Sequence, residues 1–240
     1  MNKFIHTRAE EIKYHQKFYS ENALFATGTW LARPVKVVLE MLDIMDLNEL
    51  QVLDLGCGVG RNSIPIAEKV KAYNGMITCV DLLQTAIDYL IENSKTYDVQ
   101  HNIIAQTADV ETYSIQPNSF DYIVACSCLE HLSSVDAFKT IVNGMILGTK
   151  NDGINAILMS TENQDFFLET GELKDGLIEL NLKTDEAFSL LHELYKDWEI
   201  MIERQSSHYI NEHKYGTDIE FRSNWITFIA RKKNSSEFKG

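Results

Sequence analysis

The segment LDLGCGVGRN, residues 53–62, decides the fold class of this 240-residue chain. It places Gly56, Gly58 and Gly60 within five positions, directly behind the apolar run QVLDL. A glycine-rich turn between a buried strand and a helix lets the backbone N–H groups approach a ligand closely. The segment therefore predicts a nucleotide-type binding loop, and residues elsewhere must decide which ligand it takes.

Strand-like and helix-like segments alternate on both sides of this loop. Short, nearly all-apolar runs are typical of strands that are covered on both faces of a parallel sheet. These runs lie at 51–56, 75–81, 101–109, 120–127 and 154–161. Helical stretches at 63–73, 83–97 and 135–147 follow the first, second and fourth runs. The alternation predicts an α/β doubly wound, mostly parallel sheet.

The two ends of the chain add further elements to this sheet. We expect extra N-terminal helices at 8–20 and 35–45, with Pro34 in the first turn of the second. Segment 161–180 does not match a sheet element, and a helix is expected after it at 184–195. Two strand-like runs complete seven strands as an antiparallel pair at the sheet edge. They lie at 198–210 and 224–233, with a loop at 211–223 between them and a loose tail at 232–240.

Composition narrows the class of protein. The net charge of −13 argues against a nucleic-acid substrate and an anionic membrane surface, because both need clustered Lys and Arg. The four cysteines, Cys57, Cys79, Cys126 and Cys128, lack zinc-site spacing and are expected as small buried hydrophobes in a reduced compartment. The polar N-terminus and the absence of an 18-residue apolar run predict a cytoplasmic protein. We expect no metal.

The glycine loop departs from the two phosphate-binding patterns. A dinucleotide loop, G-x-G-x-x-G, needs glycine at position 61, where Arg61 stands, and no G-K-[ST] follows for a Walker A loop. Asp54, just before the loop, would oppose a pyrophosphate and favour a cation. S-adenosylmethionine has this character, since it carries a sulfonium and an ammonium on a nucleoside without phosphates.

The segment VLDLGCGVGRNS, residues 52–63, resembles the first motif of the class I S-adenosylmethionine-dependent methyltransferases. The resemblance implies S-adenosylmethionine as cofactor and S-adenosylhomocysteine as product. It also implies that the backbone at Gly56, Cys57 and Gly58 approaches the methionine part, with Asp54 holding its ammonium. Without the resemblance, Asp54 would be a buried polar group at a strand end.

Acids after the next strands extend the resemblance. Asp81, 21 residues after Gly60, would accept hydrogen bonds from the ribose hydroxyls, with Leu82 against the adenine. Asp109 would face the adenine amino group, and Val110 would donate its N–H. Asp81 could also be a helix N-cap, and Asp109 a turn residue.

Four more residues complete the expected cofactor site. Cys126 would touch the cofactor through its backbone at the end of the fourth strand, with Ser127 beside it. Arg61 and Asn62 begin the helix after the loop and are expected at the cofactor. It stays open whether Arg61 pairs with an acid or points toward the substrate.

Candidate substrate and catalytic residues lie toward both ends of the chain. His131, in CLEHL, follows the fourth strand as a general base or a positioning group. His15, Tyr19 and Trp30 belong to an aromatic N-terminal segment that is either a lid over the methyl group or a helix packed on the core. We place His15 and Trp30 among the substrate residues and Tyr19 among the catalytic ones.

The segment NEHKYGTDIEFRSNWITFIARKK, residues 211–233, loosely resembles the end of the tellurite-resistance methyltransferases. That resemblance implies that His213 lies near an oxyanion substrate as a catalytic candidate, with Lys214 and Arg222 as substrate residues. Lys214 stands where the family has Arg, which removes bidentate anion recognition. The alternative is a charged hairpin at the sheet edge.

Together these residues predict an S-adenosylmethionine-dependent methyltransferase that acts on a small-molecule or oxyanion acceptor by in-line displacement. A nicotinamide-dependent oxidoreductase and a non-catalytic S-adenosylmethionine-binding protein remain as alternatives. We expect a single domain, in which 1–45 cover the site, 46–161 bind the cofactor, and 162–240 form the substrate side and the edge strands. The oligomeric state stays open.

Overall fold

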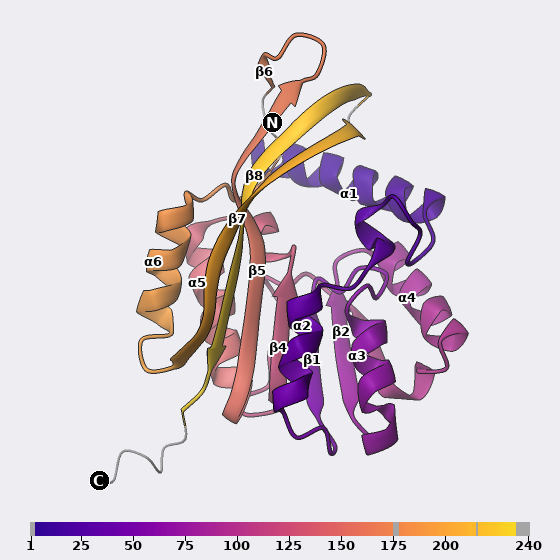
Figure 1. Cartoon of the computed structure of the whole chain (residues 1–240), viewed down its shortest axis with the longest axis vertical. Coiled ribbons are helices and arrows are strands. Elements are labelled where there is room, and N and C mark those ends of the chain that lie inside the picture. Colours follow the sequence, from indigo (N-terminus) through magenta and orange to yellow (C-terminus); the bar gives the residue numbers. More distant parts are fainter. Residues whose placement is uncertain (1–2, 175–177, 215, 234–240) are drawn as a thin grey trace.

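The computed structural model describes residues 3–174, 178–214 and 216–233. Its core is one mixed sheet with the strand order β3-β2-β1-β4-β5-β8-β7, and a short β6 pairs with β5 outside this path (Figure 1). The first five strands run parallel, and β8 runs antiparallel to both β5 and β7. The strands are β1 Gln51–Leu55, β2 Met76–Asp81, β3 Ile103–Thr107, β4 Phe120–Cys126, β5 Thr149–Phe167, β6 Leu173–Lys174, β7 Glu199–Lys214 and β8 Thr217–Arg231.

This sheet confirms the predicted α/β doubly wound, mostly parallel class with a reversed strand near one edge. The antiparallel pair is β7 and β8, of which β7 is outermost. The reversed strand β8 lies one place inside the edge, so β7 itself runs in the direction of β5.

Helices cover both faces of the sheet. The helices are α1 Lys3–Glu21, α2 Lys36–Glu40, α3 Ser63–Val70, α4 Gln84–Thr96, α5 Val135–Gly148 and α6 Thr184–Leu194. Residues of α2, α3 and α4 share one apolar core, and residues of α5 and α6 share the other. Along β4, Tyr122 and Val124 enter the first core while Ile123 and Ala125 enter the second, as the two-residue period of a strand requires.

The N-terminal helices are present with different bounds. α1 begins at Lys3, five residues before the expected start. α2 begins at Lys36, so Pro34 precedes the helix, and a 3₁₀ turn at Met41–Ile44 replaces its second half. α1 crosses the molecule near the carboxyl ends of the parallel strands (Figure 1).

Two predictions for the C-terminal third were wrong. Segment 161–180 was expected outside the sheet, but β5 continues to Phe167 and pairs there with β8 and β6. Most of the loop expected at 211–223 is strand, because β7 extends to Lys214 and pairs there with Thr217, the first residue of β8. Residue 215 lies outside the described residues. These strand ends reach past the parallel strands (Figure 1), and their polar sequences lack the apolar run of a buried strand. Residues 234–240 of the expected loose tail lie outside the described residues.

Tyr122 ties the short helix α2 to the sheet. Its side chain is fully buried, and its hydroxyl donates to the carbonyl oxygen of Val38 at 3.1 Å. We expect Tyr122→Phe to lower the free energy of unfolding by about 1 kcal/mol, because a buried hydrogen bond is lost without a change of shape. Urea denaturation measures this. Tyr209→Phe, at a tyrosine with 68% exposure, is the control; equal stabilities of the two variants would contradict the prediction.

Candidate active site

A cavity lies at the carboxyl ends of the parallel strands, beneath α1. Its volume is about 700 Å³, including open solvent at its mouth. Helix α1, the end of β2, and the segments after β1, β2, β3, β4 and β6 all contribute walls. The lining residues are Arg8, Glu11, Ile12, His15, Tyr19, Gly56, Asp81, Leu82, Leu83, Asp109, Val110, Ser127, Cys128, His131, Leu132 and Glu179.

Asp81 fastens the glycine loop to the floor of this cavity. Its two carboxylate oxygens accept the backbone N–H of Gly58 at 2.8 Å and of Leu83 at 2.9 Å. The N-cap alternative for Asp81 was wrong, because Leu83 is the N-cap of α4 and Asp81 accepts the backbone N–H of Leu83 from two residues before it. Burial raises the pKa of Asp81, and the two backbone N–H groups act against that rise. A carboxylate has about four lone-pair sites, so Asp81 keeps acceptor capacity for two hydroxyl groups of a ligand.

The glycine loop approaches the turn after β4 very closely. Gly56 has φ +71°, and a Cβ at this position would lie 2.8 Å from the Cβ of Cys128. Gly58 has φ +54°, and a Cβ there would lie 2.9 Å from the hydroxyl of Tyr19. Both positions require glycine, because a side chain would be strained and would have no room.

Ser127 holds an uncommon backbone conformation at the cavity wall. Its φ is +54°, in the left-handed region that non-glycine residues rarely occupy. Its backbone N–H donates to Leu158 O at 2.9 Å, which fixes the bend at the end of β4. Strain of this kind, held by the surrounding structure, is characteristic of binding sites.

Several expected cofactor residues lie behind the cavity wall. Asp54 is buried and accepts a hydrogen bond from Ser63 Oγ, and burial raises its pKa to about 7. Asn62 Oδ1 accepts the backbone N–H of Val35 at 3.0 Å. Cys57 and Cys126 are likewise buried. These residues brace the loop, and direct contact with a cofactor stays a prediction for them.

Arg61 points toward the N-terminal segment. Its guanidinium donates to the carbonyl oxygen of Trp30 at 3.0 Å and lies 5.3 Å from the centre of the Trp30 ring. It also donates to Cys126 Sγ at 3.5 Å. Trp30 stacks on Phe18 with ring centres 5.0 Å apart. Arg61 therefore joins the loop to the aromatic residues of α1 and the segment after it, and neither Arg61 nor Trp30 lines the cavity.

One face of α1 forms the outer wall of the cavity. Arg8, Glu11, His15 and Tyr19 follow one another at helical spacing and all line it. Arg8 pairs with Asp109 at 3.0 and 3.3 Å. Asp109 also accepts the backbone N–H of Glu111 at 3.0 Å, so it is a turn residue that lines the cavity as well.

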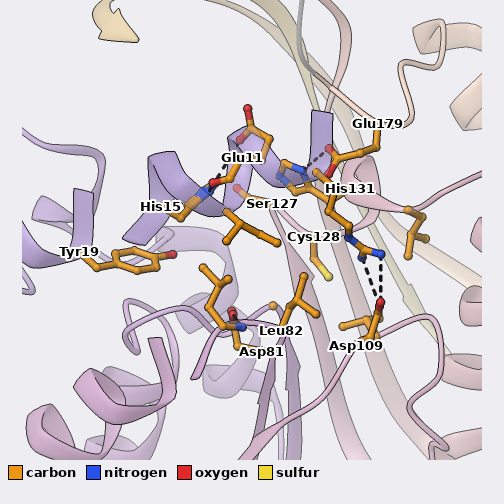
Figure 2. A pocket seen from close by; sticks show the side chains of 16 residues that line it. Glu11, His15, Tyr19, Asp81, Leu82, Asp109, Ser127, Cys128, His131 and Glu179 are labelled. Carbon is orange, nitrogen blue, oxygen red and sulfur yellow. Dashed lines mark hydrogen bonds and ion pairs between the residues drawn. The ribbon is translucent and has the colours of Figure 1, made fainter. Parts of the chain in front are cut away.

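Two histidines meet inside the cavity in different states. His131 Nδ1 lies 2.9 Å from Glu179 Oε2, and Figure 2 shows this pair beside the wall that α1 forms. Burial opposes a charge on His131, but Glu179 and the nearby Glu130 and Glu11 outweigh it and raise its pKa to about 9. His15 is 6.1 Å away between ring centres, and burial lowers its pKa to about 4. His131 is therefore an imidazolium at neutral pH and His15 a neutral imidazole.

The C-terminal candidates lie outside the cavity lining. His213 pairs with Asp218 at 2.7 Å on the β7–β8 hairpin, and Arg222 pairs with Glu220 and lies 4.2 Å from the Phe166 ring centre. Lys214 pairs with Glu11 of α1 at 2.9 Å, so it reaches the cavity only through that helix. The structure therefore places His213 and Arg222 on a charged hairpin, which was the alternative to a substrate site.

Sequence reasoning missed seven lining residues. Arg8, Glu11 and Ile12 could have been found, because they share the helical face of His15 and Tyr19. Glu179 lies in a segment without a periodic pattern, so no sequence signal pointed to it. The others are Leu83, Cys128 and Leu132.

The residues fit the cofactor that the sequence suggested. A half-buried carboxylate at the end of β2, apolar Leu82, Val110 and Leu132, and close backbone at Gly56 suit a nucleoside without phosphates. Residues 52–153 match the family model described as a methyltransferase domain. A probable S-adenosyl-L-methionine-dependent methyltransferase, TehB, of Haemophilus influenzae is 28% identical over 198 residues, which are 80% of this chain and 62% of that protein. The crystal structure of TehB from Haemophilus influenzae superposes with a TM-score of 0.64 at 22% identity, covering 92% of this chain and 66% of that one.

The chain is an S-adenosylmethionine-dependent methyltransferase.

S-adenosylmethionine is the cofactor of this methyltransferase, which removes the nicotinamide-dependent alternative. Two further relatives differ in their acceptors. A ubiquinone biosynthesis O-methyltransferase of Rickettsia typhi is 26% identical over 212 residues, which are 79% of this chain and 76% of that protein. A tRNA N(3)-methylcytidine methyltransferase of Schizosaccharomyces pombe is 30% identical over 127 residues, which are 50% of this chain and 40% of that protein.

Neither a metal cluster nor a membrane span stands out in the described parts of the methyltransferase. No group of three or more His, Cys, Asp or Glu is arranged to hold a metal there. No helix among these residues is long and apolar enough to cross a bilayer.

The close packing of Gly56 on Cys128 gives a test of the loop. We expect Gly56→Ala to weaken S-adenosylhomocysteine binding about tenfold or more, because the clash moves backbone beside the ligand. Gly171→Ala is the matched control, since Gly171 has φ +70° and a Cβ there would meet no atom within 4 Å. Both variants should lose about 1–2 kcal/mol of stability from the positive φ. Calorimetry and urea denaturation measure the two effects, and an unchanged affinity of Gly56→Ala would contradict the prediction.

Proposed function

We propose that this methyltransferase transfers the methyl group to a small-molecule or small oxyanion acceptor by in-line displacement. The observation that carries the proposal is the cavity under α1. The outer wall belongs to the chain itself, which suits a ligand that is enclosed rather than a large surface that docks.

The charges around the cavity support a small acceptor over a nucleic acid. A chain that binds a phosphate backbone needs several unpaired Lys or Arg on one face. Here Arg8 is paired with Asp109 and Lys214 with Glu11, and the whole chain carries a charge of −13. The tRNA methyltransferase relative matches over 40% of its own length. Its match therefore gives less support to a tRNA acceptor than the longer matches give to a small-molecule acceptor.

S-adenosylmethionine supplies a methyl group on a sulfonium that is already a good leaving group. The chain therefore has to position the reactants and exclude water. We assign Asp81 to the ribose hydroxyls, the backbone at Gly56 and Ser127 to the methionine side, and the inner face of α1 to the exclusion of water. In this arrangement residues 1–45 cover the site, 46–161 bind the cofactor and 162–240 form the acceptor side of a single domain.

Release of S-adenosylhomocysteine from a metabolite extract tests the reaction itself. We expect a low-molecular-mass fraction to support release with S-adenosylmethionine present. An RNA fraction should support none. Release with the RNA fraction alone would show that the methyl acceptor is a nucleic acid. Cofactor binding without release from any fraction would favour the non-catalytic alternative.

The role of Asp81 gives a direct binding test. We expect Asp81→Asn to weaken S-adenosylhomocysteine binding by about 10- to 100-fold, because a charge-assisted hydrogen bond contributes about 1.5–3 kcal/mol. Asp88→Asn is the control, since Asp88 on α4 accepts only an exposed hydrogen bond from Gln84 within the described chain. Titration calorimetry gives both dissociation constants. Equal affinities would exclude Asp81 from the ribose site.

A further inference from the structure

Each cation that lines the cavity is paired with an acid. Arg8 contacts both carboxylate oxygens of Asp109, at 3.0 and 3.3 Å. His131 Nδ1 lies 2.9 Å from Oε2 of Glu179, whose side chain is 2% exposed. A carboxylate at contact distance cancels most of the field of its partner, so neither cation attracts a second anion strongly. Within the described ranges, the lining therefore presents no unpaired cation to an anionic acceptor.

The basic residues of the β7–β8 hairpin are paired as well. Lys214 Nζ lies 2.9 Å from Oε1 of Glu11, and His213 Nδ1 lies 2.7 Å from Oδ1 of Asp218. Arg222 pairs with an acid two positions earlier on its own strand. An oxyanion acceptor needs donors with uncompensated positive charge, which these three residues do not supply.

Carboxylates outnumber cations around the cavity. The charged lining residues are Glu11, Asp81, Asp109, Glu179, Arg8 and His131. Their formal charge is −2, and an uncharged His131 would make it more negative, so the excess of acid does not depend on that histidine. Lys214, which contacts Glu11 from outside the lining, reduces the excess to one negative charge. The methyl donor brings one positive charge, on its sulfonium, because the ammonium and the carboxylate of its methionine part cancel. The excess of acid therefore matches one positive charge inside the cavity.

This match persists during the reaction for one class of acceptor. An anionic acceptor cancels the sulfonium charge and leaves the excess of acid without a partner. An uncharged alcohol, phenol or thiol has to lose a proton to reach a neutral product. An uncharged amine accepts the methyl group with its nitrogen lone pair and becomes the cation itself, so the positive charge moves from sulfur to nitrogen and stays in the cavity.

The two histidines of the cavity supply no base to an acceptor that has to lose a proton. His131 is paired with Glu179 as an imidazolium, which has no lone pair to accept a proton. His15 Nδ1 donates to the carbonyl oxygen of Glu11 at 2.9 Å, and burial lowers the pKa of His15 to about 4. An amine needs neither histidine as a base, because its uncharged form is in equilibrium with the ammonium in water.

We propose that the methyl acceptor is an aliphatic amine and that the cavity takes it up for N-methylation. This inference rests on the proposed function. The ammonium form gives its proton to water, and the lone pair of the uncharged nitrogen then forms the bond to the methyl carbon. The sulfur–methyl bond breaks and leaves its electron pair on sulfur. The product is an N-methylated ammonium ion, and its charge is stabilised by Glu11 and Glu179, which lie across the cavity from Asp81 (Figure 2).

Ion exchange of the metabolite extract tests the acceptor class on the full-length enzyme. An aliphatic amine has an ordinary pKa of about 10.4, so a cation exchanger retains it at neutral pH. We expect S-adenosylhomocysteine release with the fraction that the cation exchanger retains. Release only with the fraction retained by an anion exchanger, or only with the unretained fraction, overturns the inference and leaves the methyltransferase activity standing. No release with any fraction fails the proposed function itself.

The product identifies the methylated atom directly. With S-adenosylmethionine that carries carbon-13 in its methyl group, two-dimensional NMR separates N-methyl, O-methyl and S-methyl products by their carbon shifts. We expect an N-methyl signal that disappears when the amines of the fraction are acetylated beforehand. An O-methyl or S-methyl signal as the main product overturns the inference.

The two halves of one ion pair test the charge argument. Glu11→Gln removes a carboxylate of the lining and should lower the rate with the cation-exchanger fraction about tenfold, because one negative charge less faces the new ammonium. Lys214→Met removes a cation and should lower this rate by less than about twofold. A pair that only fastens α1 predicts equal losses, so equal losses overturn the inference, as does a larger loss in Lys214→Met.

Titration with S-adenosylhomocysteine separates this effect from damage to the cofactor side. We expect the dissociation constants of both variants to stay within about twofold of the unmodified enzyme. Glu193→Gln, at an exposed carboxylate of α6, is the control and should change neither the rate nor the affinity. A rate loss in Glu11→Gln that comes with an equal loss of S-adenosylhomocysteine affinity overturns the role of Glu11 at the acceptor.

Discussion

The site depends on the carboxylate of Asp81. By accepting the N–H groups of Gly58 and Leu83, it joins the loop after β1 to the segment that starts α4. The parallel pairing of β1 with β2 brings these two strand ends together, with Leu55 opposite Val80. The loop then needs glycine at 56 and 58, because Cys128 and Tyr19 occupy the space where side chains would lie. One carboxylate thus orients the loop and keeps acceptor capacity for the cofactor.

Electrostatics divides the cavity into two regions. On the side that we propose for the cofactor, Asp81 is a half-buried acid that suits a cationic, phosphate-free nucleoside. On the side that we propose for the acceptor, ion pairs join distant parts of the chain, Arg8 with Asp109 and Glu179 with His131. Glu179 raises the pKa of His131, whereas burial lowers the pKa of His15. The two histidines therefore differ widely in pKa although their ring centres are 6.1 Å apart.

The sequence predicted the fold and the cofactor because both rest on local patterns. Apolar runs marked the parallel strands, and the loop with Asp54, Asp81 and Asp109 marked the cofactor. The acceptor side was harder, because it is built by contacts between segments far apart in the chain. Glu179 is placed beside His131 by hydrogen bonds between Asn163 and Asn181 and between Leu180 and Glu130. The polar extensions of β5, β7 and β8 were missed for a related reason. They form strands because they pair with one another, and their sequences lack the apolar runs that predict a strand.

The wall that α1 forms has a consequence for how the protein folds. Residues of α1 form ion pairs with Asp109, on the segment after β3, and with Lys214, near the end of β7. Contacts between residues 11 and 214 close a loop that spans most of the chain, and such contacts form late. We therefore expect the ion pair between Glu11 and Lys214 to form after the local contacts of the sheet. The outer wall of the cavity is then completed late in folding, when α1 and the end of β7 come together.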